Sequence, residues 1–465
     1  MADNDPLILD FVNGRVLDGA DLGEYYMSGL ADDPPANWDD IDLEDALDLP
    51  PVLPPVRLPE EAELAGHARR SALLADLRAL AGQVRETAVQ AAAVNPILLR
   101  LAEEAELVER DDEDLAPGED AGYLDDLADD SDALDAWEYT FAVVLDTTLE
   151  AADDLDPVVA DDLDLEGHGP ALVTRLFLNW RDGVPITQLA DALRDAATVG
   201  LEAEEAGRQW QEWVDAHGDP LRLLLGQLER LGAVSVTDDT ARLEPLGVHV
   251  VRSKLERDDL FAPVLPAPDK MTPNDLVLVS MHGSDDDLEA ELASWMSSRG
   301  EEQAARELLA VAADGNATTR TAAIAIVSRL GQAAEPAWRE ALDRVELRCY
   351  AKVHLARLAG LDPESTDLPA ELESELTDLA WLLADTFGPF SHLDLGQRMP
   401  FDFGKLEQVR GLEEPDEVFE AIARLDHPDA EGVLTMFGRH TTDKKTAKAA
   451  RRAAYKASTR RAARR

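Results

Sequence analysis

The sequence predicts a mainly α-helical fold, in which helical modules with short β-hairpins precede a row of packed helices. Leucines recur every three or four residues through most of the 465-residue chain, which indicates amphipathic helices. Short alternating apolar runs follow some of these helices and indicate hairpins. After residue 300, helices of similar length alternate with tight polar turns. The length of the chain predicts two to four domains.

The clearest module spans residues 169–255. Its last predicted helix, 220–231, carries leucines at helical spacing, and Gly232 can supply the positive φ that a helix end needs. Val234 and Val236 then alternate as residues of a strand do. Helices followed by a short strand pair predict a winged-helix-like domain, with the hairpin as its wing.

Two further helices precede that ending. Thr187 is the predicted N-cap of one, because its side chain can accept a hydrogen bond from the free N–H groups of the first turn. The next helix carries Trp210 and Trp213, and aromatic residues at helical spacing indicate a core face.

A related module is predicted at residues 60–165. The stretch 96–109 resembles 223–235, with leucines at helical spacing, a small residue and a short apolar pair. No complete strand pair is evident at 110–117, so this domain is expected to be a degenerate winged helix with a degraded wing. Residues 136–145 read as a buried helix.

The second half of the chain resembles HEAT-type repeats, whose helix pairs bury their faces against neighbouring pairs. Leucines and alanines face inward in a set of predicted helices: 302–313, 317–330, 333–358, 368–387 and 416–438. Residues 276–279, Leu-Val-Leu-Val, read as a strand in the segment before this array.

Composition shifts along the chain give the domain limits. Prolines at 49–59 disfavour helix and sheet and predict an extended linker or a strap laid over a neighbouring surface. The predicted parts are an acidic Pro/Asp-rich segment, a helical domain, a winged-helix-like domain, a connector, HEAT-like repeats and a basic tail, at residues 1–59, 60–165, 166–260, 261–300, 301–438 and 439–465.

The charge of the chain limits its partners. It has 96 Asp and Glu against 43 Lys and Arg, a formal net charge of -53. Phosphate contacts rely on clusters of Lys and Arg, so duplex nucleic acid and anionic membranes are not expected to bind the body of the protein. A halophilic origin and a high-GC genome both fit this acidity.

No catalytic, cofactor or metal motif is found. A Walker or Rossmann phosphate loop and a His-Glu-x-x-His zinc motif are absent. Residues 162–167 begin like a calcium loop, but Val173 stands where a bidentate Glu is required. Ser280 and His282 lie close in sequence without a nucleophile elbow. Cys349 is the only cysteine and is expected to be a small buried hydrophobe. The chain is therefore expected not to be an enzyme and to need no cofactor.

The C-terminal residues have the opposite charge from the rest. Residues 439–465 have a net charge of +10, which leaves -63 on the remainder of the chain. Alanines favour a helix here. The possible nucleic-acid or polyanion contacts are Lys444, Lys445, Lys448, Arg451, Arg452, Lys456, Arg460 and Arg461. This tail can also fold back on the acidic body or stay disordered.

Several short stretches carry a family resemblance: residues 53–64, residues 228–234 with 243–247, and residues 425–430 with 438–440 and the basic tail. They resemble a family of actinobacterial proteins of unknown function that join winged-helix-like modules to HEAT-like repeats. The resemblance implies that architecture and no catalytic residues.

We therefore expect a non-catalytic scaffold or adaptor that binds a protein partner. The alternative is a DNA-associated regulator that contacts nucleic acid through the winged-helix domain or the basic tail. The N-terminus lacks a basic and apolar leader, and no apolar run approaches the ~20 residues of a membrane span. A cytoplasmic protein without membrane contact is the expectation.

Overall fold

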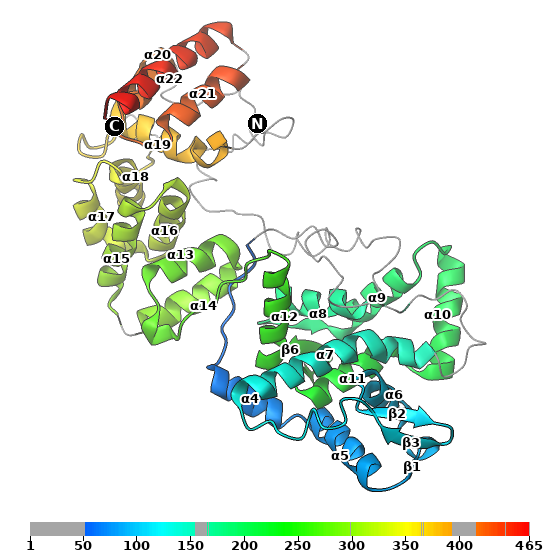
Figure 1. The fold of residues 1–465 in the computed structure, drawn as a ribbon. Helices are drawn as coiled ribbons and strands as arrows, with labels where there is room; N and C mark the ends of the chain where they lie inside the picture. The colour runs from blue at the N-terminus through cyan, green and yellow to red at the C-terminus, as the bar shows by residue number, and fades with distance from the viewer. Residues whose placement is uncertain are drawn as a thin grey trace. The chain divides into compact units, whose positions relative to one another are not determined.

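A computed structural model gives the fold (Figure 1) and describes residues 52–153, 165, 167–297, 299–363, 365, 367–392, 415–441 and 443–464. The described chain is mainly helical with small antiparallel sheets, which confirms the fold class at that level. It divides into two compact units, one that ends at Leu265 and one that begins at Pro266. We call them the sheet-bearing unit and the helical array. Most of the predicted N-terminal segment, residues 1–51, lies outside the described residues.

The sheet-bearing unit contains two successive sets of helices and strands. The first set is α4 (Glu61–Arg69), α5 (Ala72–Glu86), β1 (Val89–Gln90), η2 (Ala91–Ala93), α6 (Pro96–Glu104), β2 (Val108–Asp111), β3 (Asp114–Pro117) and α7 (Asp130–Asp153). The second set is α8 (Gly169–Leu178), β4 (Val184–Pro185), α9 (Ile186–Ala197), α10 (Ala203–His217), α11 (Pro220–Leu231), β5 (Val234–Thr237), β6 (Thr240–Leu243) and α12 (Pro245–Arg257).

Each set builds its own small sheet, and the two sheets have the same topology. The strand orders are β1-β3-β2 and β4-β6-β5. In each set, the first, short strand pairs with the second strand of the hairpin that follows it. All these pairings are antiparallel. The internal repeat read from the leucine spacing is therefore present as a repeat of topology.

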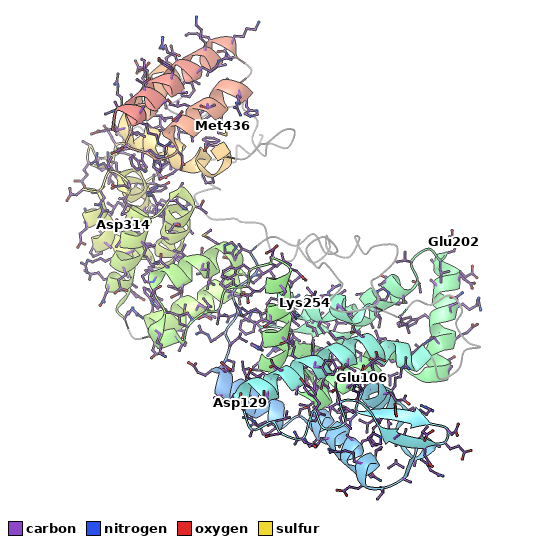
Figure 2. All side chains as sticks on the ribbon, in the orientation of Figure 1. Glu106, Asp129, Glu202, Lys254, Asp314 and Met436 are labelled. Carbon is purple, nitrogen blue, oxygen red and sulfur yellow. The ribbon has the colours of Figure 1, made fainter. Side chains whose placement is uncertain are left out.

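The first hairpin is complete, so the expectation of a degraded wing was wrong. Val108 pairs with Pro117 and Asp111 with Asp114 along β2 and β3. The sequence signal was missed because Glu106, with φ 53°, occupies the left-handed position that Gly232, with φ 82°, has in the second set. A non-glycine residue seldom adopts this conformation. Glu106, which follows the end of α6, is labelled in Figure 2.

The hydrogen bonds at the two helix ends also correspond. The N–H of Leu107 donates to the carbonyl of Ala102 at 2.9 Å, and the N–H of Ala233 donates to that of Leu228 at 2.9 Å. These bonds satisfy carbonyls that the last helical turn leaves open. Gly232 has the conformation that the sequence predicted for it.

Helix α7 forms the centre of the sheet-bearing unit. It packs against α4, α6, α8 and α11, and Figure 1 shows it alongside α11. Trp137 and Phe141 stack with ring centroids 5.4 Å apart, and both side chains are buried. The indole N–H of Trp137 donates to the carbonyl of Leu231 at the end of α11, at 2.9 Å. The helix predicted at 136–145 is therefore present, longer than expected, and buried.

The proline-rich segment is a strap, as one of the two predicted alternatives proposed. Val52 and Val56 form parallel bridges with Phe261 and Val264. The N–H of Leu53 donates to the carbonyl of Phe261 at 2.9 Å, and Leu53 is fully buried. The extended backbone that the prolines impose thus joins the core of the sheet-bearing unit.

The prediction of Thr187 as an N-cap was wrong by two residues. Helix α9 begins at Ile186, and Pro185, whose side chain cannot accept a hydrogen bond, holds the cap position. Pairing of Val184 and Pro185 with β6 fixes where the helix begins. The core assignment of the tryptophans is confirmed, since Trp213 is fully buried and Trp210 packs against the same core.

The helical array is built from helices that pack against their neighbours in sequence, among them α13 with α14, α15 with α16, α17 with α18, α18 with α19 and α19 with α20. Its elements are η3 (Pro268–Lys270), α13 (Pro273–His282), α14 (Asp285–Met296), α15 (Glu301–Asp314), α16 (Ala317–Arg329), η4 (Gly331–Ala334), α17 (Glu335–Ala341), α18 (Arg348–Leu358), α19 (Leu376–Phe387), η5 (Pro389–His392), α20 (Pro415–Ile422), α21 (Ala430–His440) and α22 (Lys444–Arg464).

The strand reading of residues 276–279 was wrong, because this run lies inside α13. Pro273 begins the helix, and Thr272 and Asp275 form a capping box before it. A short apolar run is compatible with a strand or a buried helix, and here the capping residues decide. Helix α13 packs against α15 and α16, so the residues expected to be a connector contribute to the array.

Two segments that were each predicted to be one long helix form two helices in the structure. Residues 333–358 divide into α17 and α18, and residues 416–438 divide into α20 and α21. Pro428 stands in the second break, where it has no N–H to continue a helix. Residues 368–375 lie outside α19, which begins at Leu376. Leucine spacing continued through these turns, so periodicity alone did not mark them.

The basic C-terminal residues fold as α22, red in Figure 1, which packs against α20 and α21. Five alanines of α22 belong to a core that also contains Phe419 and Phe437. The residues that the sequence placed in a tail are therefore a structural part of the array. Among the described residues, no helix combines the length and the apolar character that crossing a membrane requires.

Candidate functional site

The eight cations predicted from the sequence lie together on α22, and all eight are exposed. Alanines occupy the opposite side, where Ala450 and Ala453 are almost fully buried. The side chain of Arg451 lies close to Gly438, where an added Cβ would be only 2.6 Å from the Arg451 Cγ. Small residues let α22 approach α21, and this contact directs the cations outward.

Some of these cations form ion pairs or hydrogen bonds with other residues of the array. Lys456 forms an ion pair with Glu420 of α20, and Arg452 lies 3.6 Å from the same carboxylate. The Lys456 hydrogen bond lowers the pKa of Glu420. Arg460 donates to the carbonyl of Arg424 at 2.6 Å. By contrast, Lys444, Lys448 and Arg461 make no ion pair with any residue that the structure describes.

Tyr455 lies among these cations and was not among the contact residues predicted from the sequence. It is 75% exposed, the largest exposed fraction among the described large apolar side chains that reach solvent. Arg451 and Arg452 precede it by one helical turn, which places all three on neighbouring positions of the helix surface. A lone aromatic residue within a basic sequence was the available signal.

The other predicted contact region lies on α11, which precedes the second hairpin. Its residues Leu221, Leu224, Leu225, Leu228 and Leu231 are all buried. Helix α11 packs between α5 and α7 and also touches α9 and β5. Ser71 donates to the carbonyl of Arg230 at 3.4 Å from the α5 side, opposite the Trp137 contact from α7.

Both arginines of α11 already have acidic partners. Arg230 pairs with Asp76 of α5. Arg222 lies 3.6 Å from Asp239 in the hairpin turn and 3.9 Å from Asp219. The α11 side chains that reach solvent thus offer little positive charge to a phosphate backbone.

A cluster of buried charged and polar side chains in the helical array was not predicted. Asp385 of α19 pairs with Arg320 of α16, accepts from the Tyr350 hydroxyl at 3.1 Å, and lies 2.8 Å from His427 Nε2. The N–H of Asp429 donates to His427 Nδ1 at 3.1 Å, so Nε2 carries the hydrogen that faces Asp385. Asp385 therefore joins α16, α18 and α19 to the connection between α20 and α21.

A second buried pair lies nearby along α19. Lys352 Nζ is 2.7 Å from Asp378 Oδ2 and 2.7 Å from the carbonyl of Glu373. Asp378 and Asp385 are seven residues apart in an otherwise leucine-rich helix, so both lie on one face. Acids at core-facing positions were the sequence signal for this cluster. Because Asp378 and Asp385 are each only 1% exposed, the cluster links helices and does not present a surface.

Cys349 is buried in α18, as predicted, and burial raises the pKa of its thiol well above the usual range. His354, one turn along, stacks on Trp338 with centroids 4.6 Å apart, and burial lowers its pKa to about 4. The described residues contain no group of three or more His, Cys, Asp or Glu positioned to hold a metal ion.

Three further residues of the chain have structural roles. Ser284 accepts from the N–H of Asp287 at 3.1 Å as the N-cap of α14. Asn316 accepts from that of Thr319 at 2.9 Å as the N-cap of α16. Val173, the residue at the twelfth position of the calcium-like sequence, is fully buried in α8, whereas most of residues 162–167 lie outside the described chain.

The sheet-bearing unit exposes one further feature, an aromatic pair. Tyr123 and Tyr139 meet edge to face with centroids 5.9 Å apart and are 42% and 38% exposed. Desolvation raises the pKa of both hydroxyls, and nearby carboxylates, Asp120 among them, raise it further. We call this the tyrosine pair.

Comparison with protein-family models, curated proteins and solved structures found no match to this chain.

Proposed function

We propose that the protein is a non-catalytic protein-interaction scaffold. Its sheet-bearing unit is proposed to be a pair of winged-helix-like modules, and its helical array a HEAT-like solenoid. This is also the architecture of the actinobacterial family that the sequence resembles. Helical solenoids offer extended surfaces to protein partners.

The pairing of the α11 arginines carries the proposal. In a winged-helix module that reads DNA, the outer face of the helix before the wing lies in the major groove and offers side chains to the bases and phosphates. Here the leucines of α11 pack into the core between α5 and α7, and its arginines pair with Asp76 and Asp239. This arrangement favours a module that supports a protein surface over one that reads a base sequence.

The tyrosine pair supports a protein partner with a basic surface. Tyrosine is enriched at the centres of protein interfaces, because its ring contributes apolar area while its hydroxyl forms hydrogen bonds. The carboxylates Glu106 and Asp120 around Tyr139 add a negative potential that attracts Lys and Arg side chains.

Capture from a native lysate tests this proposal, with the full chain as bait and with parallel samples with and without nuclease. We expect wild type to retain a protein that a Tyr123→Ser, Tyr139→Ser double variant loses. A Tyr455→Ser variant, which also removes an exposed tyrosine, is the matched control and should retain it. Recovery that disappears with nuclease, or that survives in the double variant, would contradict this assignment.

The alternative of a DNA-associated regulator has one observation in its favour, the exposed cations of α22. The winged-helix part of that alternative is less supported, for the reasons given for α11. The basic helix does not depend on the scaffold proposal and carries an inference of its own.

A further inference from the structure

The geometry points to α22 as a binding surface for single-stranded nucleic acid. We infer that its cations contact phosphates and that Tyr455 stacks on a base. The inference does not rest on the proposed scaffold function, because it uses a different unit and different residues.

The arrangement of the cations is the first step. Lys444, Lys448, Arg452, Lys456 and Arg460 recur every four residues along α22, and all are exposed. We call them the basic row. A helix rises ~1.5 Å per residue, so neighbouring members are about 6 Å apart along the axis. An extended single strand can place successive phosphates at a similar spacing.

Folding alone does not account for this row. Like charges four residues apart destabilise a helix, and every neighbouring pair in the row has this spacing. Lys444 and Lys445 also occupy the first turn of α22, where the helix dipole disfavours cations. A binding role explains why the unfavourable charges lie along one ridge.

The charge is also pre-organised. The alanine side of α22 is packed on the core that includes Phe419 and Phe437, so the cations are held on a formed helix. A disordered basic tail would lose conformational entropy on binding, whereas α22 is already ordered. The unpaired Lys444 and Lys448 are available to phosphates without loss of an ion pair to a described residue.

Tyr455 and the acidic body favour a single strand over a duplex and over an acidic protein. Base stacking on an exposed aromatic ring requires an unstacked base, which a single strand offers. A duplex carries about one charge per 1.7 Å of its axis, twice the density of one of its strands, so the acidic chain repels it more strongly. An acidic peptide could pair with the cations but would leave the ring of Tyr455 without a stacking partner.

Fluorescence anisotropy with oligothymidine tests the inference, using the full chain across a range of salt concentrations. The test variant is Lys444→Gln, Lys448→Gln, Arg452→Gln. Each lost phosphate contact lowers the slope of log affinity against log salt by about 0.7, so the slope should become shallower by about 2. Tyr455→Ala should weaken binding about fivefold or more and leave the salt slope unchanged.

The matched control is Arg194→Gln, Arg208→Gln, Arg222→Gln, which removes the same charge from exposed sites of the sheet-bearing unit and should bind like wild type. Truncation before α22 is unsuitable, because it would expose the core that α22 covers. Thermal unfolding of every variant checks that the fold is retained.

Three results would overturn the inference. Unchanged binding by the basic-row variant would place the contact elsewhere. A polyglutamate peptide that competes as well as oligothymidine of the same charge would assign the surface to an acidic protein. Tighter binding of a duplex, insensitive to Tyr455→Ala, would assign it to double-stranded nucleic acid.

Discussion

Helices α11 and α22 show how differently two positively charged helices can be used. In the sheet-bearing unit, α11 precedes a hairpin in the position that often contacts DNA, yet its leucines are buried and its arginines are paired. In the helical array, α22 has no such topological position, yet its cations face solvent and some of them make no ion pair with a described residue. Burial and pairing, more than topology, indicate which helix has a surface available for a ligand.

The two units that contain these helices also differ in the residues that they bury. The core around α11 centres on Trp137 and other apolar side chains. The array also buries charged pairs around Asp385 and Asp378. An apolar core and a core that contains buried charged pairs respond differently to substitution and to pH.

The largest effect is expected for Trp137→Ala. The change leaves a cavity beside α11 and removes the hydrogen bond to the Leu231 carbonyl. We expect a loss of about 4–5 kcal/mol in the free energy of unfolding of the sheet-bearing unit. Urea unfolding of the full chain measures it. Arg222→Ala, on the outer side of α11, is the control and should change stability by no more than about 0.5 kcal/mol. Equal losses of stability in the Trp137→Ala and Arg222→Ala variants would mean that α11 is not a core helix.

Asp385→Ala should destabilise the helical array by about 3–5 kcal/mol, because the buried Arg320 loses its carboxylate partner. The same substitution also removes an acceptor from Tyr350 and His427. Glu289→Ala, at an exposed position of α14, is the matched control. A loss below about 1 kcal/mol in chemical denaturation would show that the cluster does not hold the array together.

His354 makes the array sensitive to acid. Its pKa falls from 6.5 to about 4 on folding, so the unfolded chain binds a proton at a pH where the folded chain does not. The neutral histidine therefore contributes stability above pH 6.5, and this contribution declines as the pH falls toward about 4.

The shift corresponds to about 3 kcal/mol. Denaturation at a series of pH values should show a shallower dependence for His354→Phe than for wild type between these limits. Identical pH dependence in the two proteins would contradict the assignment of the depressed pKa to His354.

A smaller effect is expected on the two sides of α22. Ala450→Leu overfills the packed side and should cost about 1–3 kcal/mol, because Ala450 is fully buried. Lys448→Leu introduces the same side chain on the exposed side and should change stability by no more than about 0.5 kcal/mol. Thermal unfolding compares the two variants. Similar melting temperatures would contradict the packing of α22 on the array.

Features that depend on the spacing of apolar residues could be predicted from the sequence. Helix ends that depend on the conformation of a single residue were missed where that residue is not glycine. Leucine spacing identified α11, and Gly232 marked its end, because glycine favours the left-handed conformation found there. The matching end at Glu106 was missed, since nothing in that residue type signals a positive φ. The breaks before Arg348 and Ala430 were missed because leucines continue through them.

The candidate sites were predictable to different degrees. The basic residues of α22 could be recognised from composition, but their alignment in a row required the helix and its packed alanine side. The partners of the α11 leucines could not be inferred, because α5 and α7 are more than 60 residues away in sequence. Asp385, Arg320 and His427 are likewise brought together only by the packing of the array.

Amide hydrogen exchange of the full chain, with and without oligothymidine, tests the contrast between the two helices most directly. We predict that the free protein protects α11 more strongly than α22, and that oligothymidine increases protection over Lys444–Arg464 while leaving Pro220–Leu231 unchanged. Added protection over α11 and the β5–β6 hairpin, with none over α22, would contradict the account.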